Sequence, residues 1–519
     1  MRSRKLHRII HTINHEAHFV NVLRINHIVL AATGGILAVA GFAPWNIFLL
    51  PIFSLALLFY LLVQAPSPRN AAWLGFAFGI GLFGVDMNGL YIALHDTGKM
   101  SVLLASLAAL LFAAFLALFP ALMAYLQAKI SLPILHKLAL LLPALWVSQE
   151  LLRGYLFTGF PWLVLGYSQV AVSPLAGFAP ILGVYGISLF IAISAGLLAL
   201  LVQLRWTKAG KATLAVLLTI WLAGGSLNMI EWTHPEGNAI KVSLLQGNIA
   251  QDEKFNKKRL INSLETYRRL IQSSDAQLIV LPETALPLLR SELPKNYINI
   301  LQAHARQQAG DVLIGAFERE HNAYYNSMFS LGSSTSQSYR KNHLVPFGEF
   351  IPMRPLLGWF INELLNIPMS DLGSGGIHQP LLNLAGQRIA VNICFEDVFG
   401  EEVIRALPDA TLLVNTSNDA WYGDSAAAMQ HNQFSQMRAL ETGRMMLRAT
   451  NTGVSSVIDR DGQMLQTLPQ HQEGVLTAQV QGYAGSTPYV RWGNAAISAL
   501  LLIMFAAAWL IRRRKASGE

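Results

Sequence analysis

The stretch from Ala179 to Leu204 reads APILGVYGISLFIAISAGLLALLVQL and contains no charged side chain. A helix needs roughly 20 mostly apolar residues to cross the hydrocarbon core of a bilayer, where nothing else can bond to its backbone. Further runs of this kind lie at 28–43, 47–63, 71–94, 102–126, 138–157, 212–230 and 495–511. The first two are short and are separated by Pro44-Trp45, so they form either two spans or one re-entrant hairpin. We expect an integral membrane bundle of about eight transmembrane helices.

The composition agrees with a membrane protein. Of 519 residues, 53% are hydrophobic and only 13% are charged, whereas a typical soluble domain carries about 25% charged residues. This excludes an ordinary cytosolic enzyme, a disordered protein and a nucleic-acid binder. The net charge of +8 comes from basic residues beside apolar runs, the pattern by which membrane proteins fix their orientation. The single cysteine excludes an internal disulfide and a cysteine-cluster metal site.

Basic residues mark the N-terminal tail and alternate loops between the apolar runs. They are Arg2, Arg4, Lys5, Arg8 and Arg24, then Arg69, then Lys129 and Lys137, and then Arg205, Lys208 and Lys211. By the positive-inside rule these segments are cytoplasmic. Seven crossings then place the next long segment outside the cytoplasm, and the last helix returns the basic C-terminus to it. We expect a transmembrane bundle over 1–231, an outer domain over 232–492, and a transmembrane helix with a basic tail over 493–519.

The long segment without a spanning run predicts an α/β domain. Short apolar runs bounded by polar or turn residues predict strands at 240–246, 277–281, 311–317, 388–393 and 410–415. Leu260, Leu264 and Tyr267 recur at helical spacing, which predicts an amphipathic helix between the first two strands. Two further helices are expected, at 297–308 and within 426–448. Alternating strands and helices indicate helices packed on sheets.

Three polar residues stand where predicted strands or turns end, and each has an ordinary structural alternative. Cys394 closes an apolar strand, where α/β sheets usually build sites, although lone cysteines are often buried as small hydrophobes. Glu283 follows another apolar strand, where partial burial suits a working base; the alternatives are a helix N-cap or a surface turn. Lys341 lies in a basic turn, which is either solvated or aimed inward by the apolar residues that follow it.

Together the three side chains suit one kind of chemistry. A thiol that accepts an acyl group needs a base to remove its proton, and a cation to stabilise the thiolate and the tetrahedral oxyanion. Glu283, Lys341 and Cys394 supply these roles from separate positions in the domain.

Five motifs carry a resemblance to a known superfamily. They are LPETALP at 281–287, YRKNHLVPFGEF at 339–350, NICFED at 392–397, NTSNDAWYGDS at 415–425 and RATNTG at 448–453. The first three resemble the catalytic motifs of the nitrilase, or carbon–nitrogen hydrolase, superfamily. The flanking apolar helices and the sequence TGFPW at 158–162 narrow the resemblance to the apolipoprotein N-acyltransferase family. Upstream of TGFPW, Glu150 and Arg153 are spaced i,i+3 and predict a structural pair on one helix face.

The resemblance covers essentially the whole chain and implies a nitrilase-like αββα domain in the periplasm. It assigns Glu283 as the general base, Lys341 as the essential lysine and Cys394 as the nucleophile. Phe395 stands where tyrosine is common. The backbone N–H of Phe395 is expected to serve the oxyanion, so the changed side chain should matter little.

Supporting positions follow from the same resemblance. Glu349 matches an acidic position beside the lysine, Glu396 one beside the cysteine, and Asn326 a further important position. For Asn326, Glu396 and Trp421 the alternative is a packing or supporting role without substrate contact.

The resemblance implies a phospholipid:apolipoprotein N-acyltransferase that works in two halves. Cys394 takes an acyl chain from phosphatidylethanolamine as a thioester, and the N-terminal amine of a diacylglyceryl-cysteine apolipoprotein then receives it, which completes lipoprotein maturation. The expected setting is the bacterial inner membrane, with membrane lipids as neighbours and no nucleic acid as partner. We expect a monomer without a cofactor. We also expect no metal, since the histidines form no ligand-like cluster. The alternative is a membrane-anchored amidase or nitrilase that hydrolyses a C–N bond.

The stretch RPLLGWFINELLNIPM at 354–369 breaks the soluble pattern with closely spaced apolar residues. It predicts either a core helix of the domain or a short amphipathic element at the bilayer surface. In the second interpretation Trp359, Phe360 and Leu364 form a lid that grips acyl chains and keeps water from the thioester, with Trp421 nearby.

Overall fold

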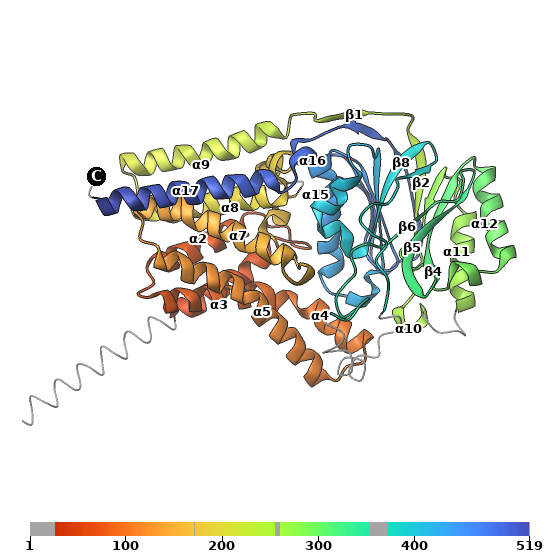
Figure 1. The fold of residues 1–519 in the computed structure, drawn as a ribbon, viewed down its shortest axis with the longest axis horizontal. Helices are drawn as coiled ribbons and strands as arrows, with labels where there is room; N and C mark the ends of the chain where they lie inside the picture. The colour runs from red at the N-terminus through yellow and green to blue at the C-terminus, as the bar shows by residue number, and fades with distance from the viewer. Residues whose placement is uncertain (1–25, 171, 255–259, 353–370, 518–519) are drawn as a thin grey trace, which may run out of the picture.

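A bundle of long helices forms one end of the molecule, and two stacked β-sheets with flanking helices form the other (Figure 1). The computed structural model describes residues 26–170, 172–254, 260–352 and 371–517. The chain leaves the bundle after helix α9 (Lys208–Leu227) and returns to it through α17 (Ala495–Ser517). The sheets are therefore inserted in the chain between two helices of one bundle, α9 and α17.

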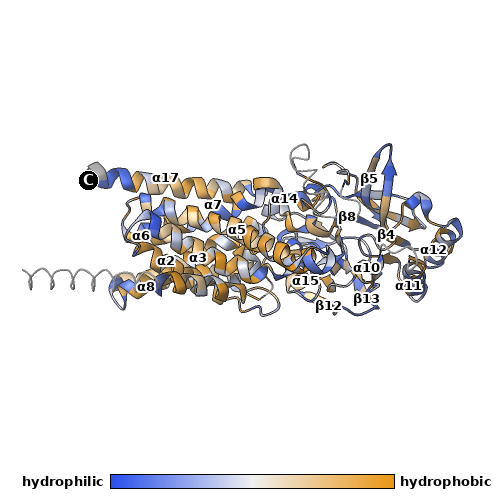
Figure 2. Cartoon of the chain, turned by 90° about the horizontal axis from the view of Figure 1, so that it is seen from below, coloured by the Kyte–Doolittle hydropathy of each residue, from blue (hydrophilic) through white to orange (hydrophobic). Residues whose placement is uncertain are grey.

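The bundle helices are apolar along most of their length (Figure 2). Besides α9 and α17 they are the helix Asn26–Val39, α2 (Leu50–Val63), α3 (Pro68–Asp86), α5 (Val102–Lys129), α7 (Leu142–Tyr155) and α8 (Ala179–Leu204). Within the described residues, four helical segments are long and apolar enough to cross a membrane. A fifth qualifies if α3 and the helix that follows it, bent by 49°, form one span. The length and composition of these helices are consistent with an integral membrane protein.

The count of eight crossings is not settled by these helices and stays a prediction. The first two predicted runs are the short apolar helices Asn26–Val39 and Leu50–Val63. The run predicted at 138–157 contains the 14-residue helix α7, preceded by a π-helical turn at Lys137–Leu141.

Small residues let two bundle helices approach closely. A Cβ placed on Gly79 of α3 would lie 2.7 Å from the Cα of Ala117 of α5, and one on Gly75 would lie 2.4 Å from the carbonyl oxygen of Pro120. Such small-residue contacts replace the hydrophobic effect as the means of packing helices within lipid.

The domain contains two six-stranded sheets, and the five strands predicted from its short apolar runs all lie within them. The first has the order β13 (Gly474–Val480), β2 (Ile240–Gln246), β3 (Leu278–Val280), β4 (Asp311–Glu320), β5 (Ala323–Gly332), β6 (Ser338–Arg340). The second has the order β12 (Met464–Leu468), β11 (Ser455–Ile458), β10 (Met446–Thr450), β9 (Leu412–Ser417), β8 (Gln387–Ile393), β7 (Leu382–Leu384). Strands β2, β3 and β4 are parallel, as are β8, β9 and β10. Their carboxyl ends are where a site is expected.

The sheets and helices form an αββα sandwich because strand residues alternate between two buried faces. Leu278 and Val280 of β3 belong to the apolar cluster between the sheets, together with Val391 of β8. Ile279 points the other way and packs with the helices α11 (Leu260–Gln272) and α12 (Lys295–Gln307). The predicted strands and the first two predicted domain helices are therefore confirmed.

The third predicted helix, α15 (Ala427–Thr442), lies between the second sheet and the bundle (Figure 1). Its Ala439 packs against Met446 of the sheet. On the bundle side, the carboxylate of Glu441 accepts a hydrogen bond from the backbone N–H of Val184 at 2.7 Å. Since α15 is buried on both faces, its polar side chains must find partners within the protein.

Candidate active site

The residues that follow β3, β6 and β8 converge on one buried site. Glu283 comes after β3, Lys341 directly after β6, and Cys394 directly after β8. The ammonium nitrogen of Lys341 lies 3.5 Å from a carboxylate oxygen of Glu283. Cys394 interacts electrostatically with both groups. Two sheets thus bring together the base, cation and thiol that the sequence singled out.

Lys341 is held as a buried cation. Its side chain is 1% exposed, and Nζ donates to a carboxylate oxygen of Glu349 at 2.8 Å. Burial lowers the pKa of Lys341, but the negative charges of Glu349 and Glu283 outweigh it and hold the pKa well above the ordinary value. A permanently charged ammonium here can stabilise negative charge on the sulfur or on a substrate oxygen.

Both carboxylate oxygens of Glu283 are fixed by hydrogen bonds. The side-chain amide of Asn326 donates to Oε1 at 2.6 Å, and the backbone N–H of Asn418 donates to Oε2 at 2.9 Å. The same Asn326 nitrogen lies 3.4 Å from Glu349. Asn326 therefore orients the proposed base and joins it to the carboxylate on the other side of Lys341.

Cys394 occupies a sharp turn at the end of β8. Its φ of 55° lies in the left-handed region, which residues other than glycine adopt at a cost. Burial and the negative charge of Glu283 raise the pKa of the Cys394 thiol far above its ordinary value, against the opposing influence of Lys341. At neutral pH the sulfur therefore keeps its proton until a base removes it, and the Glu283 carboxylate is one of the charged groups that act on the thiol.

Glu396 organises the loops around the site. Its carboxylate accepts hydrogen bonds from the backbone N–H groups of Ile393 at 2.6 Å, Asn342 at 2.6 Å and His343 at 3.0 Å, and from the hydroxyl of Tyr339 at 2.9 Å. Burial raises the pKa of Glu396 to about 7, although these backbone hydrogen bonds and the charge of Lys341 lower it. Glu396 thus ties the lysine loop to the cysteine loop.

The ring of Phe395 lies in an aromatic cluster shared with the bundle. Its ring centroid is 6.3 Å from that of Phe160 and 6.4 Å from that of Trp162, both in the TGFPW loop. On the domain side it lies 5.2 Å from Phe399. The side chain therefore faces the junction between bundle and domain.

Glu150 and Arg153 anchor this loop. Glu150 accepts hydrogen bonds from the indole of Trp146 and the backbone N–H of Leu165, both at 3.0 Å. The guanidinium of Arg153 donates to the carbonyl oxygens of Phe160 and Trp162. Glu150 and Arg153 interact electrostatically, in keeping with the expected pair. In addition, each side chain bonds to the loop after the helix, whose backbone groups would otherwise be unsatisfied.

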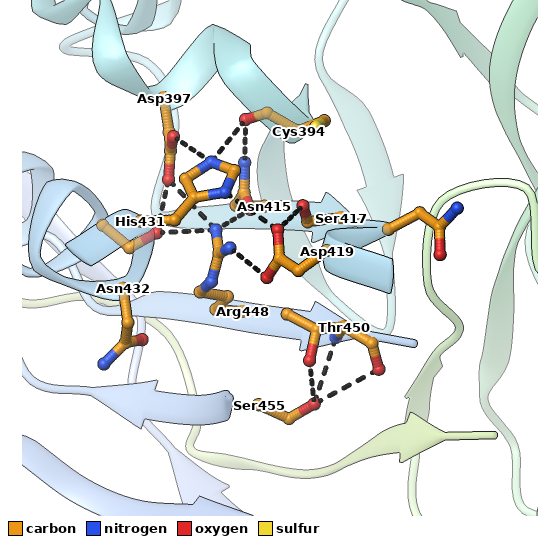
Figure 3. A network of polar contacts seen from close by, with 12 residues as sticks. Cys394, Asp397, Asn415, Ser417, Asp419, His431, Asn432, Arg448, Thr450 and Ser455 are labelled. Atoms are coloured by element: carbon orange, nitrogen blue, oxygen red, sulfur yellow. Dashed lines mark hydrogen bonds and ion pairs between the residues drawn. The ribbon is translucent and has the colours of Figure 1, made fainter. Parts of the chain in front are cut away.

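A cluster of buried ions beneath the Cys394 turn was not anticipated from the sequence. It consists of Asp397, Asp419, His431 and Arg448, which come from four different elements (Figure 3). All four side chains are at most 1% exposed. Asp397, Asp419 and Arg448 stand in three of the motifs that carry the family resemblance, which was the available signal; nothing in the sequence paired them or pointed to His431.

A second missed residue is Lys254, at the end of the short helix α10 (Gln251–Lys254). Its side chain is 1% exposed, and Nζ donates to the backbone carbonyl of Glu283 at 3.1 Å. Burial lowers the pKa of Lys254 to about 7, although the charge of Glu283 raises it. No motif marks this position in the sequence.

Of the four residues predicted to contact substrate or form a lid, the structure describes only Trp421. Trp421 is partly exposed in the short turn Asp419–Tyr422, and its carbonyl oxygen lies 3.5 Å from the hydroxyl of Thr97 of the bundle. The predicted lid residues Trp359, Phe360 and Leu364 lie outside the described residues.

A Glu, a Lys and a Cys brought together on an αββα sandwich indicate the class of the domain. Residues 241–489 match the family model described as carbon-nitrogen hydrolase. A solved CN-hydrolase superfamily protein from Xanthomonas campestris aligns with 51% of this chain and 97% of its own, with 18% identity and a TM-score of 0.34.

The rest of the chain narrows the class to one family. Residues 34–197 match the model described as apolipoprotein N-acyltransferase N-terminal domain. A protein of Nitrosomonas europaea called apolipoprotein N-acyltransferase is 49% identical over 92% of this chain and 95% of its own length. One of the same name from Methylococcus capsulatus is 42% identical over 94% and 97%. The chain belongs to the apolipoprotein N-acyltransferase family.

Proposed function

We propose that Cys394 carries an acyl chain from a membrane phospholipid to the N-terminal amine of an apolipoprotein. The chain is an acyltransferase that N-acylates apolipoproteins, in keeping with its family. The phospholipid donor, the thioester intermediate and the residues that act on them are the proposed parts. The observation that supports them most directly is the ion-paired set of Glu283, Lys341 and Glu349 beside Cys394.

In the first half-reaction Glu283 removes the thiol proton as the Cys394 sulfur attacks an ester carbonyl of the donor. We take the donor to be phosphatidylethanolamine, attacked at its sn-1 chain. The bond between the carbonyl carbon and the glycerol oxygen breaks, and the proton on Glu283 passes to that oxygen. A lysophospholipid leaves, and the acyl chain remains as a thioester. The high pKa of the Cys394 thiol supports attack coupled to proton removal over a preformed thiolate.

The oxyanion of the tetrahedral intermediate has two candidate donors. The Lys341 ammonium lies against Glu283 and carries a permanent positive charge. The backbone N–H of Phe395 follows the nucleophile directly. Fixed donors of this kind stabilise the charge that develops in the transition state without having to reorganise.

In the second half-reaction the α-amino group of the diacylglyceryl-cysteine attacks the thioester. The reference pKa of an α-amino group is about 8, so about a tenth of the amine is neutral at pH 7, and this neutral form needs to lose only one proton as the amide forms. Glu283 receives that proton, the bond between carbon and sulfur breaks, and the Cys394 thiol is restored.

Aromatic rings support the choice of a lipid donor. Phe157, with 72% of its surface exposed, lies 6.0 Å from Phe115 of α5 between ring centroids. The contacts continue to Phe112 at 6.4 Å, to Phe160 at 5.0 Å, and from there to Phe395 beside the nucleophile at 6.3 Å. A row of aromatic rings thus extends from the exposed Phe157 on the bundle to Phe395 beside the thiol, and such an apolar surface suits an acyl chain.

The loop charges and the odd number of expected crossings before residue 232 support a domain on the outer side of the bacterial inner membrane, that is, in the periplasm. We further propose that the predicted domain boundaries hold and that the enzyme acts as a monomer on its two lipid substrates.

Incubation of the purified enzyme with phosphatidylethanolamine in nanodiscs tests the assignment. We expect the intact mass to rise by one acyl chain, located on Cys394 by peptide mapping. The variant Cys394→Ser should gain no thioester, and Lys341→Ala should gain it far more slowly than wild type. A wild type that stays unmodified while it hydrolyses a small amide would instead support the amidase alternative.

A further inference from the structure

The buried ion cluster beneath the Cys394 turn lies outside the mechanism proposed above. Asp397 and Asp419 contribute two negative charges, and Arg448 contributes one positive charge, with Arg448 nitrogens 3.3 Å from Asp397 and 2.9 Å from Asp419. An uncompensated charge without access to water is costly. The cluster is neutral if His431 is an imidazolium.

The geometry around His431 fits that charge state. Nδ1 lies 3.0 Å from an oxygen of Asp419, and Nε2 lies 3.1 Å from an oxygen of Asp397, so each ring nitrogen faces a carboxylate (Figure 3). Only the protonated ring can donate from both nitrogens. Burial and the charge of Arg448 lower the pKa of His431, but Asp397 and Asp419 outweigh them and raise it above its ordinary value.

The same cluster reaches the nucleophile through a backbone carbonyl. Nε2 of His431 lies 3.2 Å from the carbonyl oxygen of Cys394, and the side-chain amide of Asn415 donates to that oxygen at 3.0 Å (Figure 3). Asn415 is itself fixed, because its amide oxygen accepts a hydrogen bond from Arg448. The carbonyl of Cys394 is therefore held by donors from β9 and α15.

Holding this carbonyl determines where the next N–H points. The peptide bond between Cys394 and Phe395 is trans, so the carbonyl oxygen of Cys394 and the N–H of Phe395 share one plane and point in opposite directions. Because Cys394 has a φ of 55°, the turn does not hold this orientation by intrinsic preference. Hydrogen bonds to the carbonyl also polarise the amide and strengthen its N–H as a donor.

We propose that His431 is a positioning residue that aims the Phe395 N–H at the oxyanion by holding the Cys394 carbonyl. The role rests on the proposed thioester mechanism. It predicts a specific defect: steps that pass through an oxyanion slow down, and the sulfur itself stays reactive.

Two reactions of the same thiol separate these effects. Acylation by phosphatidylethanolamine passes through a tetrahedral oxyanion, whereas alkylation by iodoacetamide displaces iodide from a saturated carbon and forms none. Both can be followed by intact mass on the full-length enzyme in nanodiscs. In the double variant His431→Leu/Asp419→Asn the remaining Asp397 and Arg448 balance each other, so the donor is lost without leaving an unpaired buried charge.

We expect this double variant to acylate Cys394 10- to 100-fold more slowly, the scale of a misaligned or weakened donor. Its KM for the lipid and its alkylation rate should stay within about threefold of wild type. The matched variant His431→Gln/Asp419→Asn restores a side-chain N–H donor at nearly the same reach and should recover at least a third of the wild-type acylation rate.

Asn432 provides a control on the same helix. Its side-chain oxygen accepts a hydrogen bond from Ser456 at 2.6 Å, on the side of α15 away from Cys394 (Figure 3). Asn432→Ala should leave both rates unchanged. The inference would be overturned if acylation and alkylation fell together in the double variant His431→Leu/Asp419→Asn, or if its acylation did not fall. A wild type that never acylates Cys394 would overturn the proposed function itself.

Discussion

Replacing Lys341 with methionine removes the positive charge that lies between the carboxylates of Glu283 and Glu349. The ammonium lies 2.8 Å from Glu349 and 3.5 Å from Glu283. At an effective dielectric constant of 20 these contacts correspond to gross attractions of roughly 6 and 5 kcal/mol, which the desolvation of the ions offsets in part. We expect the loss of about 3–5 kcal/mol of unfolding free energy that is typical of breaking a buried pair. Thioester formation should fall by about 10²- to 10³-fold, as for one lost oxyanion donor.

The double variant Lys341→Met/Glu349→Gln separates the structural loss from the chemical one. It removes one of the two carboxylates that the lysine neutralises, so part of the stability should return, whereas the rate should not. Thermal unfolding in detergent measures the first quantity and single-turnover acylation of Cys394 measures the second. Acylation of the single variant within threefold of wild type, or its recovery in the double variant, would refute the assignment of Lys341 to the chemistry.

Three further predictions concern neighbouring residues. The pKa of Lys254 is lowered to about 7 in the folded protein, against 10.5 ordinarily. Between these pH values the unfolded chain binds one more proton than the folded protein, so the stability of the wild type rises with pH. The thermal midpoint of Lys254→Met minus that of wild type should therefore be highest at pH 7 or below and decline toward pH 10, and a difference that does not change with pH would contradict the burial argument. Glu396→Ala should slow acylation at least tenfold because Asn342 and His343 lose their common acceptor, with Glu396→Gln less affected; equal rates in the two variants would count against this role. Phe395→Tyr should acylate within threefold of wild type, and a larger change would show that the ring, as well as the backbone, acts in the site.

Local sequence patterns were sufficient for the domain because its strands alternate or run apolar within a few residues. The run at 240–246 became β2 with the same bounds, and Glu283 and Cys394 could be placed because each directly follows such a run. The roles of Lys341, Glu349 and the catalytic set as a whole needed the family resemblance, since a basic turn is ordinarily solvated.

Long-range pairing could not be predicted in this way. Asp419, His431 and Arg448 are separated along the chain. They meet because β9 and β10 pair in one sheet and α15 packs against that sheet. Likewise, Glu150 bonds to a backbone N–H 15 positions further along the chain, a contact that depends on how the loop folds back. Helical spacing alone favoured a pairing with Arg153.

The most direct test follows one acyl chain through the Cys394 sulfur. The enzyme is loaded from phosphatidylethanolamine with an isotope-labelled chain, separated from free lipid, and mixed with a synthetic diacylglyceryl-cysteine peptide. We predict that label leaves Cys394 and appears as an amide on the peptide amine with the same rate constant. Amide that forms faster than the thioester decays, or that forms on Cys394→Ser, would contradict a covalent intermediate on this residue.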